Sequence, residues 1–385
     1  MLNDFSFASV SDVRIGPGSS DELGASVRER SSKHVLVVTD AEILALGLLD
    51  SALTSLKKNG IAVTIFSEVV ADPPESVVFS GLELARKAGC DGVVGFGGGS
   101  SLDVAKLLAV LIKSNQSLAE IYGVDRIDGS RLPLIQVPTT AGTGSEATMV
   151  SIITTGKTTK AGVVSRSLLA DSIILDASLT LGLPAHVTAA TGIDAMVHAI
   201  EAFTSVRLKN PLSDMLAKES LSMLSTNISK AVHNGDDLSA RQEMLIGAML
   251  AGQAFANAPV AAVHALAYPL GGNYHIPHGL SNSLVLPHVL RFNEPSAASL
   301  YYQLVPSIFG SDKALMQGQA TAMLAEYFLD LARDFGLPTA LSELDIPEDD
   351  LEMLADEAML QTRLLINNPR EMEKPDALAI YRKAY

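Results

Sequence analysis

The sequence is poor in residues that mark several classes of protein. Its 385 residues include no tryptophan, few other aromatic residues and one cysteine, Cys90. Aliphatic side chains and alanine must therefore fill the core. A single cysteine excludes an intrachain disulfide, which suits a reducing compartment, and the start MLNDFSFASV lacks the basic and apolar regions of a signal peptide. We therefore expect a cytoplasmic protein.

Positive charge is also scarce. Lysine and arginine number 28 against 43 aspartates and glutamates, which gives a net charge of −15. Such a chain repels phosphate backbones and anionic membrane surfaces, so we expect neither nucleic acid nor a membrane as a partner. The most apolar long run, residues 245–272, is interrupted by polar residues and by Pro259. It predicts a buried helix and turn rather than a membrane span.

The first half of the sequence alternates short apolar runs with helix-like segments. The apolar runs predict strands at 34–39, 61–66, 92–96 and 133–138. The segments between them predict a helix from residue 40 to Asn59 and further helices at 75–88 and 102–113. Alternating strands and helices indicate βαβ units and a parallel sheet, so we predict an α/β domain.

The pattern changes near Pro184. Beyond it, long alanine- and leucine-rich helical patterns dominate and clear strand runs disappear. A chain of 385 residues is long enough for about two domains. We therefore predict an α/β domain over residues 1–184 and a helical domain over residues 185–385.

A glycine-rich turn joins the predicted strand at 92–96 to the helix that follows. Gly97, Gly98 and Gly99 have no Cβ atom, so the backbone can approach a phosphate closely, and a helix start offers N–H groups and the positive end of its dipole. We expect this turn and Ser100 to hold a pyrophosphate; a structural tight turn is the alternative. Ser100 and Asp103 also fit a capping box.

Two further segments fit a dinucleotide site. Asp40 ends the strand at 34–39, where a carboxylate can bind an adenosine ribose and would repel a 2′-phosphate, so NAD is favoured over NADP; capping of the next helix is the alternative. The segment PTTAGTGSEAT (138–148) offers hydroxyl donors to phosphate or nicotinamide oxygens, with a surface loop as the alternative. These donors are Thr139, Thr140, Thr143 and Ser145.

Asp194 and His198 are four residues apart in the helical pattern TGIDAMVHAIEAF. On an α-helix this spacing places both side chains on one face, where a carboxylate and an imidazole can bind one divalent metal. His264 and His278 lie downstream in stretches marked by glycine and proline, and they can complete a set of four ligands. Histidines that serve only the core are the alternative.

Several of these motifs together resemble the iron-containing (group III) alcohol dehydrogenase family. GGGSSLDVAK and PTTAGTGSEAT are similar to two of its signatures, and the segments GIDAMVHAIEAF, VHALAYPLGG and HIPHGLSNSLVLPHVLRFN are similar to its metal-binding segments. The resemblance covers nearly the whole chain. It implies a dehydroquinate synthase-like architecture, with an N-terminal α/β domain that binds NAD(P) and an all-helical C-terminal domain that holds a metal.

The resemblance also implies roles for individual residues. It implies metal ligation by Asp194, His198, His264 and His278, pyrophosphate contacts from Gly97, Gly98, Gly99 and Ser100, and a cofactor cleft lined by Thr139, Thr140, Thr143 and Ser145. Lys160 matches a position that usually contacts the cofactor ribose, and Leu179 matches one near the adenine.

Tyr268 departs from the family pattern. Relatives often have a histidine there, four residues after the third ligand, with a proton-relay or substrate-contact role. A phenol ionises near pH ~10 in water and is a poor base at neutral pH. We nevertheless take Tyr268 as the candidate catalytic residue, with His275 as a further candidate for proton exit.

The expected activity is hydride transfer between NAD(H) and a small neutral alcohol or aldehyde whose oxygen a metal polarises. Oxygen and nitrogen ligands suit Fe²⁺ and also Zn²⁺. One rival is a metal-independent reductase of the maleylacetate reductase type, which four filled ligand positions disfavour. The other is a lyase resembling dehydroquinate synthase, which needs a basic pocket that is not evident. We expect a homodimer or a higher homo-oligomer.

Overall fold

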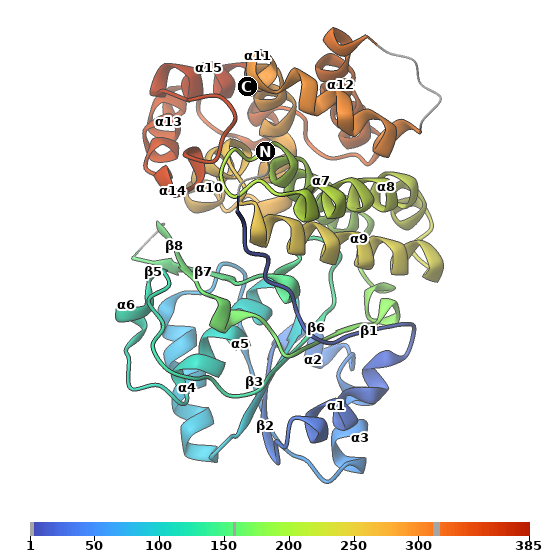
Figure 1. Cartoon of the computed structure of the whole chain (residues 1–385), viewed down its shortest axis with the longest axis vertical. Coiled ribbons are helices and arrows are strands. Elements are labelled where there is room, and N and C mark those ends of the chain that lie inside the picture. Colours follow the sequence, from blue (N-terminus) through green and yellow to red (C-terminus); the bar gives the residue numbers. More distant parts are fainter. Residues whose placement is uncertain (1–3, 157–158, 311–315) are drawn as a thin grey trace. The chain divides into compact units, whose positions relative to one another are not determined.

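A computed structural model describes residues 4–156, 159–310 and 316–385 of the chain (Figure 1). The chain forms two compact units. The first is Ala8–Gly182, and the second is Leu183–Tyr385 with the described residues that precede Ala8. The division falls between Gly182 and Leu183, and each unit has its own architecture.

The described part of the first unit is built on a six-stranded sheet in the order β1-β9-β6-β4-β2-β3. All of its pairings are parallel, so the α/β prediction is confirmed. The strands are β1 (Val13–Ile15), β2 (His34–Asp40), β3 (Ala62–Val69), β4 (Gly92–Gly97), β6 (Leu134–Pro138) and β9 (Ser172–Leu175). A smaller sheet, which the sequence did not predict, contains β5 (Gly123–Val124), β7 (Val150–Thr155) and β8 (Thr159–Val164).

Helices cover both faces of the large sheet. Helices α1 (Leu23–Glu29) and α3 (Asp50–Lys58) share a core with Val35 and Val37 on one face. Helices α4 (Glu75–Ala88) and α5 (Gly99–Leu111) lie on the other, where α5 packs directly on β4. The predicted helix from residue 40 to Asn59 is wrong, because Gly47 turns with φ +70° between α2 (Ala41–Ala45) and α3. Helix α6 (Leu118–Ile121) follows α5.

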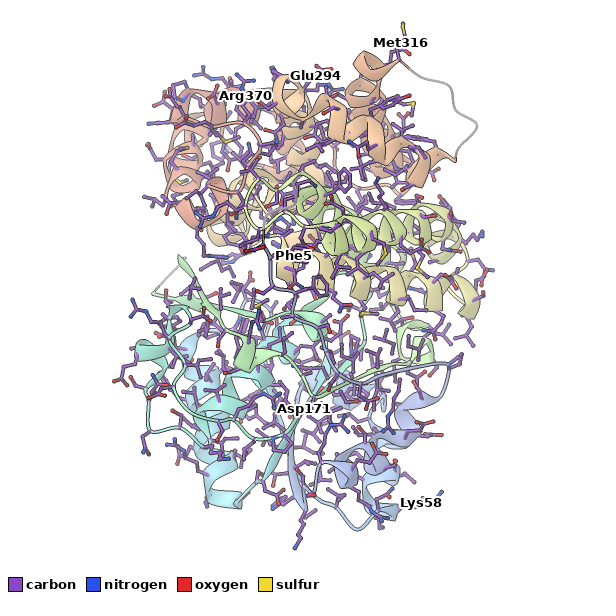
Figure 2. All side chains as sticks on the ribbon, in the orientation of Figure 1. Phe5, Lys58, Asp171, Glu294, Met316 and Arg370 are labelled. Carbon is purple, nitrogen blue, oxygen red and sulfur yellow. The ribbon has the colours of Figure 1, made fainter. Side chains whose placement is uncertain are left out.

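An ion-pair cluster lies where β6 and β9 begin. Arg131 places two nitrogens on Asp171, at 2.6 and 2.9 Å. Arg30 donates to the Asp171 carbonyl oxygen at 3.0 Å and to Asp12 at 2.8 Å. Asp171, labelled in Figure 2, also accepts the backbone N–H of Leu134. The cluster therefore joins the starts of these strands and takes no part in the predicted cofactor site.

A buried lysine links α5 to the segment after β6. Lys106 is completely buried, and its Nζ donates to the hydroxyls of Ser145 (2.8 Å) and Thr148 (2.9 Å) and to the Val150 carbonyl (2.7 Å). Burial lowers the pKa of Lys106, although the adjacent Asp103 carboxylate at 3.1 Å acts against this. These bonds hold the 138–148 segment to the helix that begins at the glycine turn.

The predicted capping box of Ser100 and Asp103 is wrong. Helix α5 begins after Gly98 without a side-chain cap. Asp103 instead accepts the Ser145 hydroxyl at 2.5 Å and the Ile152 backbone N–H at 2.8 Å. Its carboxylate therefore faces the buried Lys106 network and leaves the backbone N–H groups of the helix start to other partners.

The described residues of the second unit contain helices and no strand, which confirms the predicted helical domain architecture. The α-helices are α7 (Ala185–Thr204), α8 (Pro211–His233), α9 (Leu238–Asn257), α10 (Ala262–Tyr274), α11 (His278–Phe309), α12 (Ala320–Asp334), α13 (Leu351–Met359), α14 (Thr362–Leu365) and α15 (Lys374–Ala384). Helix α7 packs against α8, α9 and α11. Among the described residues no single helix is long and apolar enough to cross a membrane; α9 and α10 pass together on length and composition only, bent by 108°.

Helices α7 and α11 lie close together at Gly279. A Cβ atom added there would lie 2.4 Å from the carbonyl oxygen of Ala190 and 3.2 Å from the Cβ of Asp194. The first of these is a backbone atom, which cannot rotate away. Glycine at this position therefore allows the start of α11, with His278, to lie against α7.

We expect Gly279→Ala to destabilise the helical unit by about 1–3 kcal/mol or more, because the new methyl group overpacks a rigid contact. Gly271→Ala is the matched control, since a Cβ at Gly271 of α10 meets only an atom at 3.5 Å. The control should change stability by no more than about 1 kcal/mol. Chemical denaturation of both variants measures the difference, and equal stability would contradict the role given to Gly279.

The stability of the first unit should depend on pH through Glu146. This residue is 2% exposed, and burial raises its pKa from 4.5 to about 7, although its own backbone N–H and Lys106 act in the opposite direction. Between pH 4.5 and 7 the folded state retains a proton that the unfolded state releases, so stability falls as the pH rises. Relative to Glu146→Gln, the wild type should lose on the order of 3 kcal/mol across this window. Denaturant titrations at several pH values test this, and parallel curves for the two proteins would refute it.

Candidate metal and nucleotide sites

The four candidate metal ligands converge from three helices. Asp194 and His198 lie one turn apart on α7, His264 lies in the first turn of α10, and His278 is the first residue of α11. One ligand atom from each residue lies within 4.8 Å of the others. The i, i+4 spacing therefore places the pair on one face as expected, and the packing of α10 and α11 brings the two distant histidines to it.

The cluster is buried on most sides. Asp194, His198 and His264 are each no more than 4% exposed, whereas the His278 side chain is 40% exposed. Burial acts to raise the pKa of Asp194, but the neighbouring histidines and a hydrogen bond from Asn282 outweigh it, and the pKa is lowered. The carboxylate is therefore held in its charged form, with an open side at His278.

Asn282 points its amide nitrogen into the cluster. This residue lies one turn after His278 on α11, and its Nδ2 donates to Asp194 Oδ1 at 2.5 Å. The same nitrogen lies 3.2 Å from His278 Nε2 and 3.4 Å from His264 Nε2. One atom from each of three of the four candidate ligands thus lies within 3.4 Å of the same amide nitrogen.

Glu201 lies behind His264, on the side away from the cluster. It is 4% exposed and one turn after His198 on α7. Its Oε2 accepts from His264 Nδ1 at 2.6 Å, and its Oε1 accepts the Val263 backbone N–H at 2.7 Å. With Nδ1 donating, the lone pair of His264 Nε2 faces the other ligands.

Aromatic and apolar groups lie beside the cluster. The Phe255 ring stacks on His198 at a centroid distance of 4.5 Å, and the Tyr268 ring lies 5.9 Å from that of His278. Both pack against a small core cluster that includes Leu364. Tyr268 is therefore near the predicted site, whereas His275 is exposed in the left-handed turn that ends α10.

These residues fit a divalent metal. One buried carboxylate and three imidazoles form an oxygen and nitrogen donor set that first-row transition metals accept. Each ligand comes from a packed helix, and one donor atom from each residue lies within 4.8 Å of the others. The orientation of His264 by Glu201 is the type of support that metal-binding histidines usually have.

The predicted nucleotide-binding residues lie largely at the carboxyl edge of the large sheet. Strands β2, β4 and β6 are neighbours in parallel register, and they end at Asp40, at Gly97 of the glycine turn and at Pro138, directly before Thr139. In open α/β sheets, ligands bind at this edge. The sheet order therefore brings together three segments that the sequence separates, from Asp40 to Thr139.

The glycine turn is shaped for close approach. Gly97 has φ +148°, and a Cβ there would lie 2.9 Å from Ser101 Oγ, whereas one at Gly99 would lie 2.7 Å from Thr143 Cγ2. At Gly98 the nearest atoms lie 3.8 Å away, on Thr140. The backbone at Gly98 is therefore accessible, at the start of a helix of 13 residues, and suits an anionic group of a dinucleotide.

Asp40 caps a helix, as one of its two predicted roles requires, and it also lies beside the glycine turn. Its Oδ1 accepts the Ile43 backbone N–H at 2.8 Å and caps α2. Its Oδ2 lies toward the glycine turn, 3.6 Å from the position of a Cβ on Gly97. One oxygen therefore serves the helix, while the other faces the expected position of a cofactor.

The hydroxyl residues after β6 divide into two groups. Ser145 is buried and donates to Asp103, so its hydroxyl proton serves the Lys106 network. Thr139 is also buried, with its backbone N–H on the Gly97 carbonyl. Thr140 and Thr143 lie against Gly98 and Gly99, nearer to the expected phosphate position.

The structure gives Lys160 and Leu179, the two residues expected to contact the cofactor, partners within the protein. Lys160, on β8, donates to the Thr154 hydroxyl at 3.1 Å and pairs with Asp72. Leu179 is 6% exposed and belongs to the core below the sheet. Its contacts are those of a packing residue.

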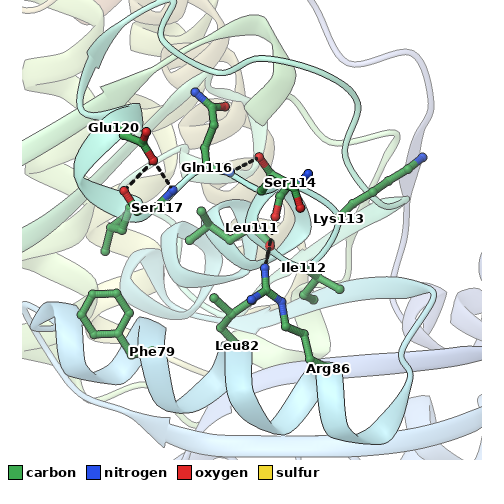
Figure 3. Close-up of a pocket in the computed structure, with 12 residues that line it drawn as sticks. Phe79, Leu82, Arg86, Leu111, Ile112, Lys113, Ser114, Gln116, Ser117 and Glu120 are labelled. Carbon is green, nitrogen blue, oxygen red and sulfur yellow. Dashed lines mark hydrogen bonds between the residues drawn. The ribbon is translucent and has the colours of Figure 1, made fainter.

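A hollow of about 550 Å³ lies elsewhere on the first unit (Figure 3). Phe79 and Arg86 of α4 line it, together with Lys113 and Glu120 near α6. Arg86 donates to the carbonyls of Leu111 and Ser114, at 2.7 and 3.1 Å. The lining contains none of the sequence-predicted site residues, so the hollow is separate from the nucleotide site.

Sequence reasoning missed Glu201 and Asn282. Each carries a local signal: Glu201 lies seven residues after Asp194, in the same apolar helical run, and Asn282 lies four residues after His278. Because both meet partners far away in the sequence, their roles become visible only when α7, α10 and α11 are packed together.

Comparisons with known proteins agree with this geometry. Residues 11–177 match the family described as iron-containing alcohol dehydrogenase, and residues 188–385 match the C-terminal part of that family. The long-chain-alcohol dehydrogenase 1 of Geobacillus thermodenitrificans is 41% identical over 374 residues, covering 96% of this chain and 94% of that protein.

Solved structures agree as well. A crystal structure of 1,3-propanediol oxidoreductase superposes with a TM-score of 0.96 at 33% identity, and all of both chains is covered. A sulfoacetaldehyde reductase from Bifidobacterium kashiwanohense, solved in complex with NAD⁺, gives 0.89 at 28% identity, over 100% of this chain and 99% of that one. The chain belongs to the iron-containing alcohol dehydrogenase family.

Proposed function

We propose that the chain transfers hydride between NAD(H) and a small alcohol or aldehyde whose oxygen is held at the cluster of Asp194, His198, His264 and His278. The observation that carries this proposal is the convergence of these four side chains within 4.8 Å in a buried setting. When bound, the metal would act as a Lewis acid on the substrate oxygen, and the nicotinamide would accept or return the hydride.

The protein's own residues supply position and surroundings. Helix α7 holds Asp194 and His198 rigidly on one face, and Glu201 keeps the Nε2 lone pair of His264 directed inward. Phe255 covers one face of His198 and keeps water from it. The more exposed His278 marks the side from which a substrate enters, and Tyr268 beside it is our candidate for substrate contact or proton transfer.

The substrate is proposed to be small and neutral. Aromatic faces of Phe255 and Tyr268 border the cluster, and they suit a hydrocarbon chain better than a phosphate or a second carboxylate. We propose Fe²⁺ as the metal, as the family implies, with Zn²⁺ as the alternative, because the donor set accepts both. We further propose a cytoplasmic homodimer or higher homo-oligomer.

The proposed cofactor is NAD, bound with its pyrophosphate at Gly97–Ser100. The accessible backbone at Gly98, the start of α5 and the Asp40 Oδ2 beside Gly97 support this assignment. Thr140 and Thr143 are the proposed hydroxyl contacts of the 138–148 segment, with Thr139 and Ser145 holding it in shape. From the resemblance we retain Lys160 and Leu179 as proposed cofactor contacts.

Asp194→Ala removes the only carboxylate of the cluster. We expect metal content and alcohol-dependent NAD⁺ reduction to fall at least about 100-fold. Removing a residue that only supports a ligand can already lower metal affinity or activity by about 100-fold, and Asp194 is a proposed ligand itself. The protein is purified anaerobically, loaded with Fe²⁺ or Zn²⁺ and tested on a panel of small alcohols. Asp334→Ala, at an exposed pair with His233, is the control. No activity of the wild type with either metal, or full activity of Asp194→Ala, would contradict the proposal.

Asp40→Ser tests the choice of cofactor. A serine can still cap α2, but it has no charge to repel a 2′-phosphate. We expect the wild type to prefer NAD⁺, and the ratio of kcat/KM for NAD⁺ over NADP⁺ to fall about tenfold or more in the variant, on the order of 1.4 kcal/mol. Asp50→Ser removes an equal charge at the start of α3 and should leave the ratio unchanged. A wild type that prefers NADP⁺ would refute the role of Asp40.

A further inference from the structure

We propose that Glu201 is a positioning residue that sets the tautomer of His264 and thereby the metal affinity of the cluster. The inference rests on the proposed function, because His264 is one of the proposed ligands. Both carboxylate oxygens of Glu201 bond to residues of α10, and Glu201 acts on the cluster through His264.

The geometry gives Glu201 two simultaneous bonds. Oε2 accepts from His264 Nδ1 at 2.6 Å, and Oε1 accepts from the backbone N–H of Val263 at 2.7 Å. The Val263 N–H belongs to the first turn of α10, where backbone donors have no partner within the helix. Because the N-cap of α10 makes no side-chain hydrogen bond, the Glu201 carboxylate supplies an acceptor from α7 instead.

A neutral imidazole carries one proton and one lone pair. If Nδ1 donates to Glu201, the lone pair is on Nε2, which faces Asn282 and the other candidate ligands. If the proton moved to Nε2, that nitrogen could no longer ligate a metal. The carboxylate thus selects the tautomer that can bind, and its buried position gives the His264 ring little freedom to turn.

Glutamine is the informative replacement because it keeps the shape of glutamate but offers a single acceptor oxygen to two N–H donors. If that oxygen stays on the Val263 N–H, the amide –NH₂ faces Nδ1, which must then accept, and the ring proton shifts to Nε2. Loss of such supporting partners typically weakens metal binding by about 10–100-fold. We expect a loss of Zn²⁺ affinity in this range for Glu201→Gln.

The matched control is Glu357→Gln. Glu357 also accepts a side-chain N–H in the helical unit, from Asn273 at 2.7 Å, but it contacts none of the four candidate ligands through that bond. This variant should bind Zn²⁺ as the wild type does. Circular dichroism of the metal-free proteins shows whether each variant is folded before affinities are compared.

The experiment has two readouts. Competition with a chromogenic chelator gives Zn²⁺ affinity for the wild type, Glu201→Gln and Glu357→Gln. Long-range ¹⁵N–¹H correlation spectra of the metal-free proteins, with His264 assigned from His264→Asn, report the ring tautomer. We expect a protonated Nδ1 in the wild type and a protonated Nε2 in Glu201→Gln.

The outcomes separate this inference from the proposed function. A wild type with its proton on Nε2, which needs no variant to fold, would overturn the inference. So would a Glu201→Gln protein whose Zn²⁺ affinity stays within twofold of the wild type, and in that case the metal site itself would stand. A wild type that binds neither Zn²⁺ nor Fe²⁺ would remove the proposed function and this inference together.

Discussion

The buried negative charge of Asp194 is the constraint on which the helical unit depends. A carboxylate that is 2% exposed is costly unless charges and donors surround it. Here the compensation comes from three histidines and the amide of Asn282, which lie on α7, α10 and α11. The three helices must therefore meet closely, and Gly279 permits the α7–α11 contact by having no Cβ. The compensation of the Asp194 charge and the close packing of α7 on α11 are thus both required at the contact between Asp194 and Gly279.

The first unit also contains a buried ionisable group that needs surrounding partners, in this case a lysine. Lys106 is a buried cation whose three donor positions reach two hydroxyls, a carbonyl and the Asp103 carboxylate. These partners come from α5 and from the segment that follows β6. These hydrogen bonds therefore join helix α5, which begins at the glycine turn, to the 138–148 segment. A phosphate-binding turn needs such support, because its own glycines give it little stiffness.

Much of this arrangement was predictable from local pattern. Residues only a few positions apart define the strand runs and the helical spacing of Asp194 and His198. They also define the change near Pro184 from alternating strand and helix patterns to helical patterns alone. The roles of Ser145, Glu201 and Asn282 depend instead on partners 42, 63 and 88 residues away. Local chemistry misled at Asp103, which has the spacing of a capping residue but bonds to the buried lysine network, because that network is available only in the fold. The prediction of one helix from residue 40 to Asn59 failed for a simpler reason. The apolar periodicity of the sequence continues through Gly47, so it gave no sign of the break there.

The two ring nitrogens of His264 face different partners on opposite sides of the ring. On the outer side of His264, the ring Nδ1 meets the Glu201 carboxylate; on the inner side, Nε2 lies 3.4 Å from Asn282 Nδ2, which donates to Asp194. A cation would bind the folded arrangement, which has no equivalent in the unfolded chain, and would stabilise the fold by mass action. In the proposed function, the residues that hold the metal for substrate chemistry would therefore also make the stability of the helical unit depend on that metal.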